Sequence, residues 1–242
     1  MLEFLPDRAS GGPLRVLCLG AHSDDIEIGC GGTLLRLLQE RDDVEIWWVV
    51  FSSGADRERE ARESAALFLE GAAASHVLVR DFRNGHFPYI GSAIKEFFEE
   101  LKAQVDPDLI FTHYRTDRHQ DHRVLSDLAW NTWRNHVILE YEIPKYDGDL
   151  SQPNAYVVLD EETCARKVRF LMQVFATQRD KHWFDERTFQ GLMRLRGMES
   201  CAPEGYAEAF HVRKLVLAPR RAGVRAPEGT LASESSTHRT RA

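Results

Sequence analysis

Short apolar segments alternate with segments of helical periodicity along most of the chain, and this alternation limits the fold more than any other feature. The apolar or β-branched runs typical of strands lie at 14–21, 44–52, 76–82, 108–113, 137–141, 155–159 and within 206–217. The segments typical of helices lie between them, at 30–39, 56–70, 90–105, 121–135 and 160–178. Strands separated by helices are joined by crossover connections. The pattern therefore predicts an α/β fold with a mostly parallel sheet and helices on both faces.

Length and composition favour one domain. The chain has 242 residues, which suits a single α/β domain. After Pro219, Arg, Ala, Gly, Ser and Thr dominate without apolar periodicity. We therefore predict one domain over 1–218 and a disordered tail over 219–242. A net charge of −7 argues against a nucleic-acid partner, which requires a basic face.

Targeting signals are not evident in the sequence. No apolar run has the length of a transmembrane segment, so none is expected. The first residues, MLEFLPDRASGG, carry acids and a proline where a signal peptide would have lysines followed by an apolar stretch. The sequence therefore predicts a cytoplasmic protein.

Two polar clusters follow two of the predicted strands. The first cluster is 21–25, with the sequence AHSDD, and the second is 113–122, with the sequence HYRTDRHQDH. Loops at the carboxyl ends of parallel strands share one edge of a sheet, where they form the ligand crevice. We therefore expect several histidines and aspartates to gather in one small space.

Imidazole and carboxylate groups are ligands of zinc, and a catalytic zinc keeps one position open for water. Either cluster alone has a simpler explanation, as a helix N-cap or a solvated ion pair. Two clusters at one sheet edge favour a metal site. Gly29, Gly31 and Gly32 resemble a phosphate loop, but their spacing is GxGG rather than GxGxxG, which argues against dinucleotide binding.

Segments 22–25, 29–33 and 119–123 together resemble the PIG-L/LmbE-like deacetylase family, whose usual signature is AHPDD near the N-terminus and HPDH further on. Segment 206–210 is similar to a late motif of the family, so the resemblance spans roughly 14–217. It implies a Rossmann-like α/β fold. It also implies a zinc-dependent hydrolase that removes the N-acetyl group of an N-acetylglucosamine-type sugar or its conjugate.

The resemblance also implies roles for particular residues. The implied zinc ligands are His22, Asp25 and His122. Asp24 would be the general base, and His119 the conjugate acid or oxyanion partner. Asp121 lies beside both histidines of its segment, and which one it orients stays open. Another divalent transition metal could replace zinc at such ligands.

The sequence departs from the family pattern at several positions. Ser23 replaces the usual proline, and residues 176–178 (ATQ) stand where the family often has His-x-Ser-Gln. An arginine after the second strand often serves the site in this family, and the candidates are Arg57, Arg59 and Arg62. Glu208 either supports a residue of the site from behind or forms a surface ion pair.

We expect the substrate to be chosen by loops at 83–92, 142–154 and 180–205. Their aromatic side chains suit stacking on sugar rings and are Phe87, Tyr89, Tyr146, Trp183 and Phe184. The partner expected is therefore a small acetamido sugar or glycoconjugate, and oligomerisation stays open. Two alternatives remain: a non-catalytic sugar- or nucleotide-binding module that kept the metal site, and a zinc hydrolase of another amide or ester. Asp24, which metal binding does not need, favours an enzyme.

Overall fold

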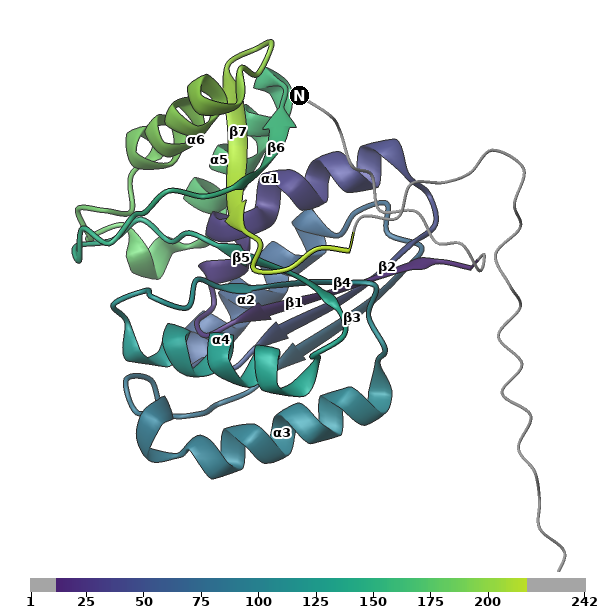
Figure 1. Ribbon diagram of the computed structural model, residues 1–242. Helices are drawn as coiled ribbons and strands as arrows, with labels where there is room; N and C mark the ends of the chain where they lie inside the picture. Colours follow the sequence, from purple (N-terminus) through teal and green to yellow (C-terminus); the bar gives the residue numbers. More distant parts are fainter. Residues whose placement is uncertain (1–11, 217–242) are drawn as a thin grey trace, which may run out of the picture.

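The computed structural model describes residues 12–216, which form a seven-stranded mixed sheet and six α-helices (Figure 1). The strands are β1 (Leu14–Gly20), β2 (Val44–Val50), β3 (Ala74–Val79), β4 (Leu109–His113), β5 (Val137–Tyr141), β6 (Ala155–Leu159) and β7 (Tyr206–His211). The helices are α1 (Asp25–Glu40), α2 (Ala55–Phe68), α3 (Gly91–Gln104), α4 (Gln120–Thr132), α5 (Glu161–Val174) and α6 (Glu186–Ser200). Two short 3-10 helices are η1 (Phe87–Tyr89) and η2 (Ala176–Gln178).

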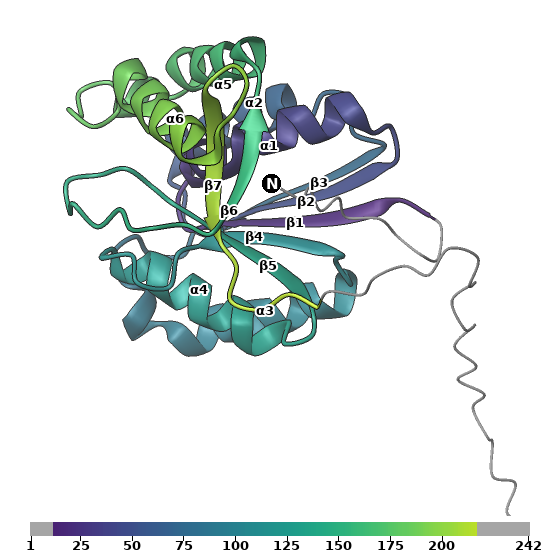
Figure 2. The same cartoon turned by 45° about the horizontal axis from the view of Figure 1, so that its top comes forward.

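The strand order is β3-β2-β1-β4-β5-β7-β6. The first five strands pair in parallel, whereas β7 runs antiparallel to both β5 and β6. Helices α1, α2, α5 and α6 cover one face, and α3 and α4 cover the other (Figure 2). The predicted fold class is confirmed as a single mixed α/β sheet with helices on both faces.

Strand β1 shows why its sequence forms a central strand. Its side chains alternate between the two faces, so that Val16 and Cys18 join the core beneath α1, while Leu17 and Leu19 join the core beneath α3 and α4. All four are fully buried, which accounts for the continuous apolar run. Trp48 on β2 is likewise completely buried.

One expected loop is a helix. Segment 180–205 contains α6, so the expectation of an irregular substrate loop there was wrong. Its sequence gives a weak helical signal because Gly191 and Gly197 lie inside it. Gly197 is required by packing, since a Cβ there would come 2.1 Å from the carbonyl oxygen of Gly205. Asp185 is the N-cap of this helix, and its carboxylate accepts the Arg187 N–H.

The predicted tail, 219–242, lies outside the described residues. Among residues 12–216, no helix combines the length and the apolar character needed to cross a membrane.

The fold places the site at the ends of β1 and β4. The chain leaves β1 toward β2 on one side and later returns to β4 on the other, and ligands bind at such a switch point. Helix α1 packs closely here because Gly29 and Gly31 lack side chains. A Cβ at Gly29 would lie 2.3 Å from the Tyr141 ring, and one at Gly31 would lie 2.6 Å from Phe68. The glycine run is therefore a packing feature and not a phosphate loop.

Candidate functional site

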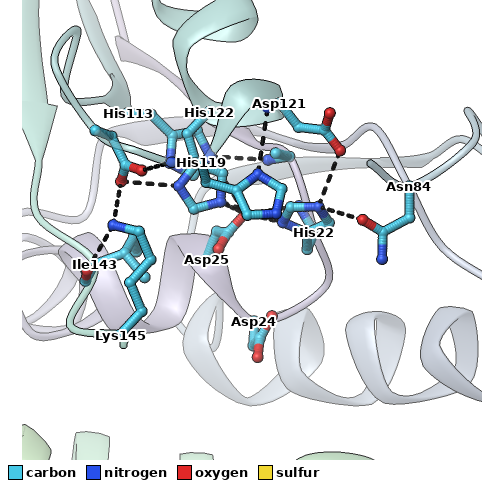
Figure 3. A network of polar contacts seen from close by, with 12 residues as sticks. His22, Asp24, Asp25, Asn84, His113, His119, Asp121, His122, Ile143 and Lys145 are labelled. Carbon is cyan, nitrogen blue, oxygen red and sulfur yellow. Dashed lines mark hydrogen bonds and ion pairs between the residues drawn. The ribbon is translucent and has the colours of Figure 1, made fainter. Parts of the chain in front are cut away.

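The two polar clusters meet at the ends of β1 and β4 (Figure 3). His22 follows β1, Asp25 is the first residue of α1, and His122 lies in the first turn of α4. His22 Nδ1 is 3.2 Å from Asp25 Oδ2 and 3.2 Å from His122 Nε2, and the latter two atoms are 3.5 Å apart. Tetrahedral zinc with bonds of about 2.0–2.1 Å separates its ligand atoms by about 3.3 Å. The three predicted ligands therefore present a triangle of the size that zinc requires.

In each of the two imidazoles, the ring nitrogen outside the triangle faces hydrogen-bond acceptors and therefore carries a proton. His22 Nε2 faces two acceptors, Asn84 Oδ1 at 3.1 Å and Asp121 Oδ2 at 3.4 Å, and so carries the proton. His122 donates Nδ1–H to Asp117 Oδ2 at 2.9 Å. The remaining ring nitrogens, His22 Nδ1 and His122 Nε2, therefore face each other at 3.2 Å. A cation between them would relieve this arrangement, and carboxylate contacts of this kind orient metal-binding histidines.

Electrostatics at the site also favour a cation. Burial lowers the pKa of His22, but the charge of Asp25 and the contact with Asp121 outweigh it and raise that pKa to about 10. Without a metal, His22 therefore holds a second proton on Nδ1, and a metal ion bound there would displace that proton. Burial and the neighbouring His113 lower the pKa of His122 to about 3, so this imidazole is neutral, as a metal ligand must be. Despite burial, the surrounding histidines hold the pKa of Asp25 well below its ordinary value. The site thus attracts positive charge.

Asp24, the predicted base, is 4% exposed and precedes α1. Its Oδ1 accepts a hydrogen bond from Arg57 Nη2 at 2.6 Å. Its buried Oδ2 has no hydrogen-bond partner among residues 12–216. Of the three candidate arginines, Arg57 is therefore the one at the site, whereas Arg59 and Arg62 pair with glutamates of their own helix. Figure 3 shows the Asp24 carboxylate set apart from the imidazoles.

His119 lies immediately before α4 and packs against two of the predicted ligands. Its ring meets His22 edge-on at 4.8 Å and stacks on His122 at 4.6 Å between centroids. Its Nδ1 accepts the Asp121 N–H at 3.3 Å, which leaves the ring proton on Nε2. Burial and the charge of His22 lower the pKa of His119, so the neutral form is favoured.

The Asp121 carboxylate contacts His22 rather than either histidine of its own segment. It also accepts N–H bonds from Gly85 at 2.6 Å and Phe87 at 3.1 Å. Gly85 has a φ of +76°, a conformation that favours glycine, so a turn after β3 delivers these N–H groups. Asp121 thereby joins the loop after β3 to a predicted metal ligand.

His113 has no assigned role in the sequence-based prediction, although it lies in the second cluster. It ends β4, is fully buried and accepts the Ala21 N–H through Nε2 at 3.0 Å. Asp25, His113 and His122 form one possible donor set, and His22, His119 and His122 form another. Both sets share His122, so the cluster offers alternative ligands around one position rather than two separate sites.

The sequence missed other contacts of the site. Asp117 lies five residues before His122 in the same motif, and that proximity was the available signal. Asn84 carried no signal beyond its place between a strand and Gly85. The contact between Asn84 and His22 joins residues that are 62 positions apart, so only the folded structure shows it.

The aromatic side chains of the expected substrate loops differ in accessibility. Phe87 and Phe184 are buried, and Trp183 packs against the core. Tyr89 and Tyr146 are 83% and 70% exposed, so these two remain available to a substrate.

A family model and a curated relative that match this chain are both described as deacetylases. Residues 17–133 match the PIG-L family, described as GlcNAc-PI de-N-acetylase. An uncharacterized deacetylase of Escherichia coli is 33% identical over 141 residues, which cover 53% of this chain and 74% of that protein.

Solved structures share the fold at lower identity. N,N'-diacetylchitobiose deacetylase from Pyrococcus horikoshii has a TM-score of 0.60 at 20% identity, covering 82% of this chain and 83% of that chain. The 4-carboxy-2-hydroxymuconate hydratase GalB from Pseudomonas putida has a TM-score of 0.67 at 15% identity, covering 86% of this chain and 100% of that chain. Because deacetylases and a hydratase share it, the fold alone does not specify the chemistry.

The family match covers both polar clusters that meet at the site, and the E. coli relative is a deacetylase. The chain therefore belongs to the PIG-L (GlcNAc-PI de-N-acetylase) family of deacetylases.

Proposed function

We propose that the protein is a zinc-dependent hydrolase that removes the acetyl group from the nitrogen of an acetamido sugar of the N-acetylglucosamine type, or from its conjugate. The observation that carries this proposal is the triangle of His22 Nδ1, Asp25 Oδ2 and His122 Nε2, with edges of 3.2–3.5 Å. The outer nitrogens of both imidazoles donate away from this triangle, so a divalent cation would displace only the inner proton of His22.

A zinc ion bound there would supply a Lewis acid and lower the pKa of a coordinated water. Asp24 accepts the proton of the attacking water through Oδ2, which has no other partner among the described residues. Arg57 holds the other carboxylate oxygen and so fixes the direction of the base. Metal binding alone would not require this buried, oriented carboxylate.

The remaining steps fall to His119 and Asp24. The Nε2–H of neutral His119 donates to the carbonyl oxygen as negative charge develops on it. Asp24 then returns its proton to the sugar nitrogen as the C–N bond breaks, which releases acetic acid and the amine. Proton transfer from the acid to the amine then gives acetate and the ammonium form of the sugar. Protons and charge balance without an additional reactant.

The sugar assignment rests on the family and on the neighbours' names. The family description names GlcNAc-PI, and the P. horikoshii neighbour acts on diacetylchitobiose, as their names state. Both are acetamido sugars. Exposed Tyr89 and Tyr146 also suit stacking on a sugar ring.

The test is amine release from a panel of substrates by the purified, zinc-loaded full chain. The panel contains free GlcNAc, UDP-GlcNAc, GlcNAc-inositol, GlcNAc-lipids and acetylated antibiotic precursors. We expect release of amine and acetate in equal amounts from at least one member, and loss of that activity after chelation. Binding of acetamido sugars without acetate release would instead favour a binding module, and turnover of other amides or esters alone would overturn the sugar assignment.

A further inference from the structure

The segment 142–154 is a long irregular connection between β5 and β6. Strand β5 pairs with β4, whose following loop carries the second polar cluster, so this segment borders the site on the β5 side. Long connections without secondary structure are uncommon in compact domains and are usually functional.

One buried guanidinium contacts this segment at its first residue and again near its end. Arg196 on α6 donates to the two carboxylate oxygens of Glu142, at 2.9 Å from Nε and 2.6 Å from Nη2. The same Nη2 donates to the Ser151 carbonyl oxygen at 3.0 Å. Arg196 is only 3% exposed, so this bidentate contact is protected from solvent. Residues 142–151 therefore form a loop with a fixed base, called the β5 loop below.

A single ammonium group fixes the middle of the β5 loop. Lys145 Nζ lies 2.9 Å from Asp117 Oδ2 and 2.7 Å from Asp149 Oδ2. Asp149 Oδ2 also accepts the Arg118 N–H at 2.7 Å. The side chains of Lys145, Asp117 and Asp149 are at most 10% exposed, so these contacts are more persistent than an ordinary surface ion pair.

Asp117 connects Lys145 to the predicted metal ligand His122. Asp117 Oδ2, which faces Lys145, also accepts the Nδ1–H of His122. Figure 3 shows Lys145 and Asn84 on opposite sides of the imidazole cluster. Asp117 is held independently of Lys145, because its Oδ1 accepts the His119 N–H at 2.7 Å. Loss of Lys145 would therefore release the β5 loop before it disturbed His122.

The β5 loop presents apolar groups outward beside a hollow. Tyr146 is 70% exposed and Leu150 is 44% exposed. Leu150, Lys145 and Asp117 line a hollow between the β5 loop and the loop after β4. Leu150 lines this hollow, and Tyr146 is exposed next to Lys145 on the same loop. Aliphatic and aromatic side chains of this kind are common in the walls of ligand sites.

We propose that Lys145 is a positioning residue that locks the β5 loop in place as the wall contacted by the part of the substrate beyond its acetamide. This inference rests on the deacetylase function proposed above. It extends that function by assigning to Tyr146 and Leu150 the contacts with the substrate beyond its reacting group. The contacts of Lys145 that hold this loop in place are called the latch below.

The test compares Lys145→Met, Lys145→Arg and the control Lys95→Met. Lys95 also pairs with an acid four residues later, Glu99, but it lies on α3. The first readout needs no activity: chymotrypsin cleavage after Tyr146 in the zinc-loaded protein. Because cleavage follows the population of the open loop, we expect it to be about tenfold faster in Lys145→Met. Lys145→Arg should restore slow cleavage, and Lys95→Met should match the wild type.

The second readout is kinetic, on a substrate identified by the panel. We expect Lys145→Met to raise KM about tenfold, with kcat and bound zinc close to wild type, because the wall contributes binding rather than chemistry. Unchanged cleavage after Tyr146 would overturn the latch, whether or not the protein is a deacetylase. Loss of zinc or of kcat with unchanged KM would show that Lys145 acts through His122 instead. An absence of any deacetylation, with the cleavage result intact, would overturn the proposed function and the wall's role in it.

Discussion

Two imidazoles and one carboxylate meet at the centre of the site, and each imidazole has a different second contact. His22 is held by Asn84 and Asp121, and His122 by Asp117. Such contacts fix the ring orientation and raise ligand basicity. Residues that hold the metal should therefore separate experimentally from residues that act only on the reacting groups.

Metal content should distinguish the ligands from His119. His22→Ala and His122→Ala should lose about one zinc ion per chain, because each removes a corner of the ligand triangle. His119→Ala should keep the metal and lose most of kcat, because its role is in the transition state. Elemental analysis of the purified variants, together with amine release, measures both. Full metal in both ligand variants would refute the ligand set.

The sequence predicted the histidines and aspartates of the site better than their contacts. His22, Asp25 and His122 stand in short motifs that can be recognised locally. Asn84 and Lys145 carry no such signal, because they reach the site only through the loops after β3 and β5. The choice of Arg57 among three arginines likewise required the folded position of α2.

Helix α1 is fixed by a buried ion pair that contacts it one to two turns after Asp25. Glu208 on β7 accepts the N–H groups of Gly32 at 2.8 Å and Thr33 at 2.6 Å, and it pairs with Lys167 of α5 at 2.6 Å. Lys167 also donates to the Ile28 carbonyl oxygen. Glu208 is therefore neither a direct contact of the metal ligands nor a surface ion pair: it holds the helix that begins with Asp25.

Removing Glu208 should destabilise the fold strongly. Glu208→Ala leaves the Lys167 charge buried without its partner, which typically costs about 3–5 kcal/mol. Urea denaturation measures the free energy of unfolding. The double variant Glu208→Ala/Lys167→Met should recover part of the loss, since it removes the uncompensated charge. A loss below about 1 kcal/mol in the single variant would mean that this pair does not hold α1.

The N-cap of helix α5, Asp160, should make a pH-dependent contribution to the stability of the fold. Asp160 accepts the Thr163 N–H at 2.6 Å, and this bond lowers the pKa of Asp160 below 3.8. The stabilisation is therefore fully present above pH 3.8 and is lost as the pH falls through the lowered folded-state pKa. Asp160→Ala should cost about 1 kcal/mol at pH 7, and Asp160→Asn much less. Denaturation at pH 7 and at pH 3 checks this, and an equal cost at both values would contradict it.

Most elements were predictable because their apolar patterns are local. Strands 137–141 and 155–159 match β5 and β6 at both ends, and the buried run of β1 is clear in the sequence. Helix α6 was not predicted, because two glycines weaken its local signal, and one of them, Gly197, is required by a contact with the turn before β7. Packing of the helix against the following turn therefore decided what local propensity could not.

Metal binding should stabilise the fold of the whole domain. The predicted ligands come from the end of β1, from α1 and from α4, and these two helices lie on opposite faces of the sheet. A bound ion would therefore join elements from both faces. The sequence predicted the α/β sheet, but not the order of β7 between β5 and β6, because antiparallel pairing at that edge follows from no crossover rule.

Zinc should therefore raise the melting temperature. At free zinc about 100 times Kd, binding to the folded state adds about 2.7 kcal/mol, a rise of about 5–10 °C for a domain of this size. Thermal unfolding of chelated and zinc-loaded protein measures the shift. His122→Ala is the matched control and should show little dependence on zinc. Equal shifts in both proteins would place the stabilising ion elsewhere.

In the proposed mechanism, Asp24 serves as base beside a metal held by Asp25. Asp24→Asn keeps the shape of the side chain but removes its ability to take a proton. The direct measurement is kcat for amine release by zinc-loaded Asp24→Asn, with bound zinc and melting temperature determined on the same sample. We predict wild-type zinc content and stability, with kcat lower by at least about 100-fold. Near-normal kcat in a folded, zinc-loaded Asp24→Asn protein would contradict the mechanism.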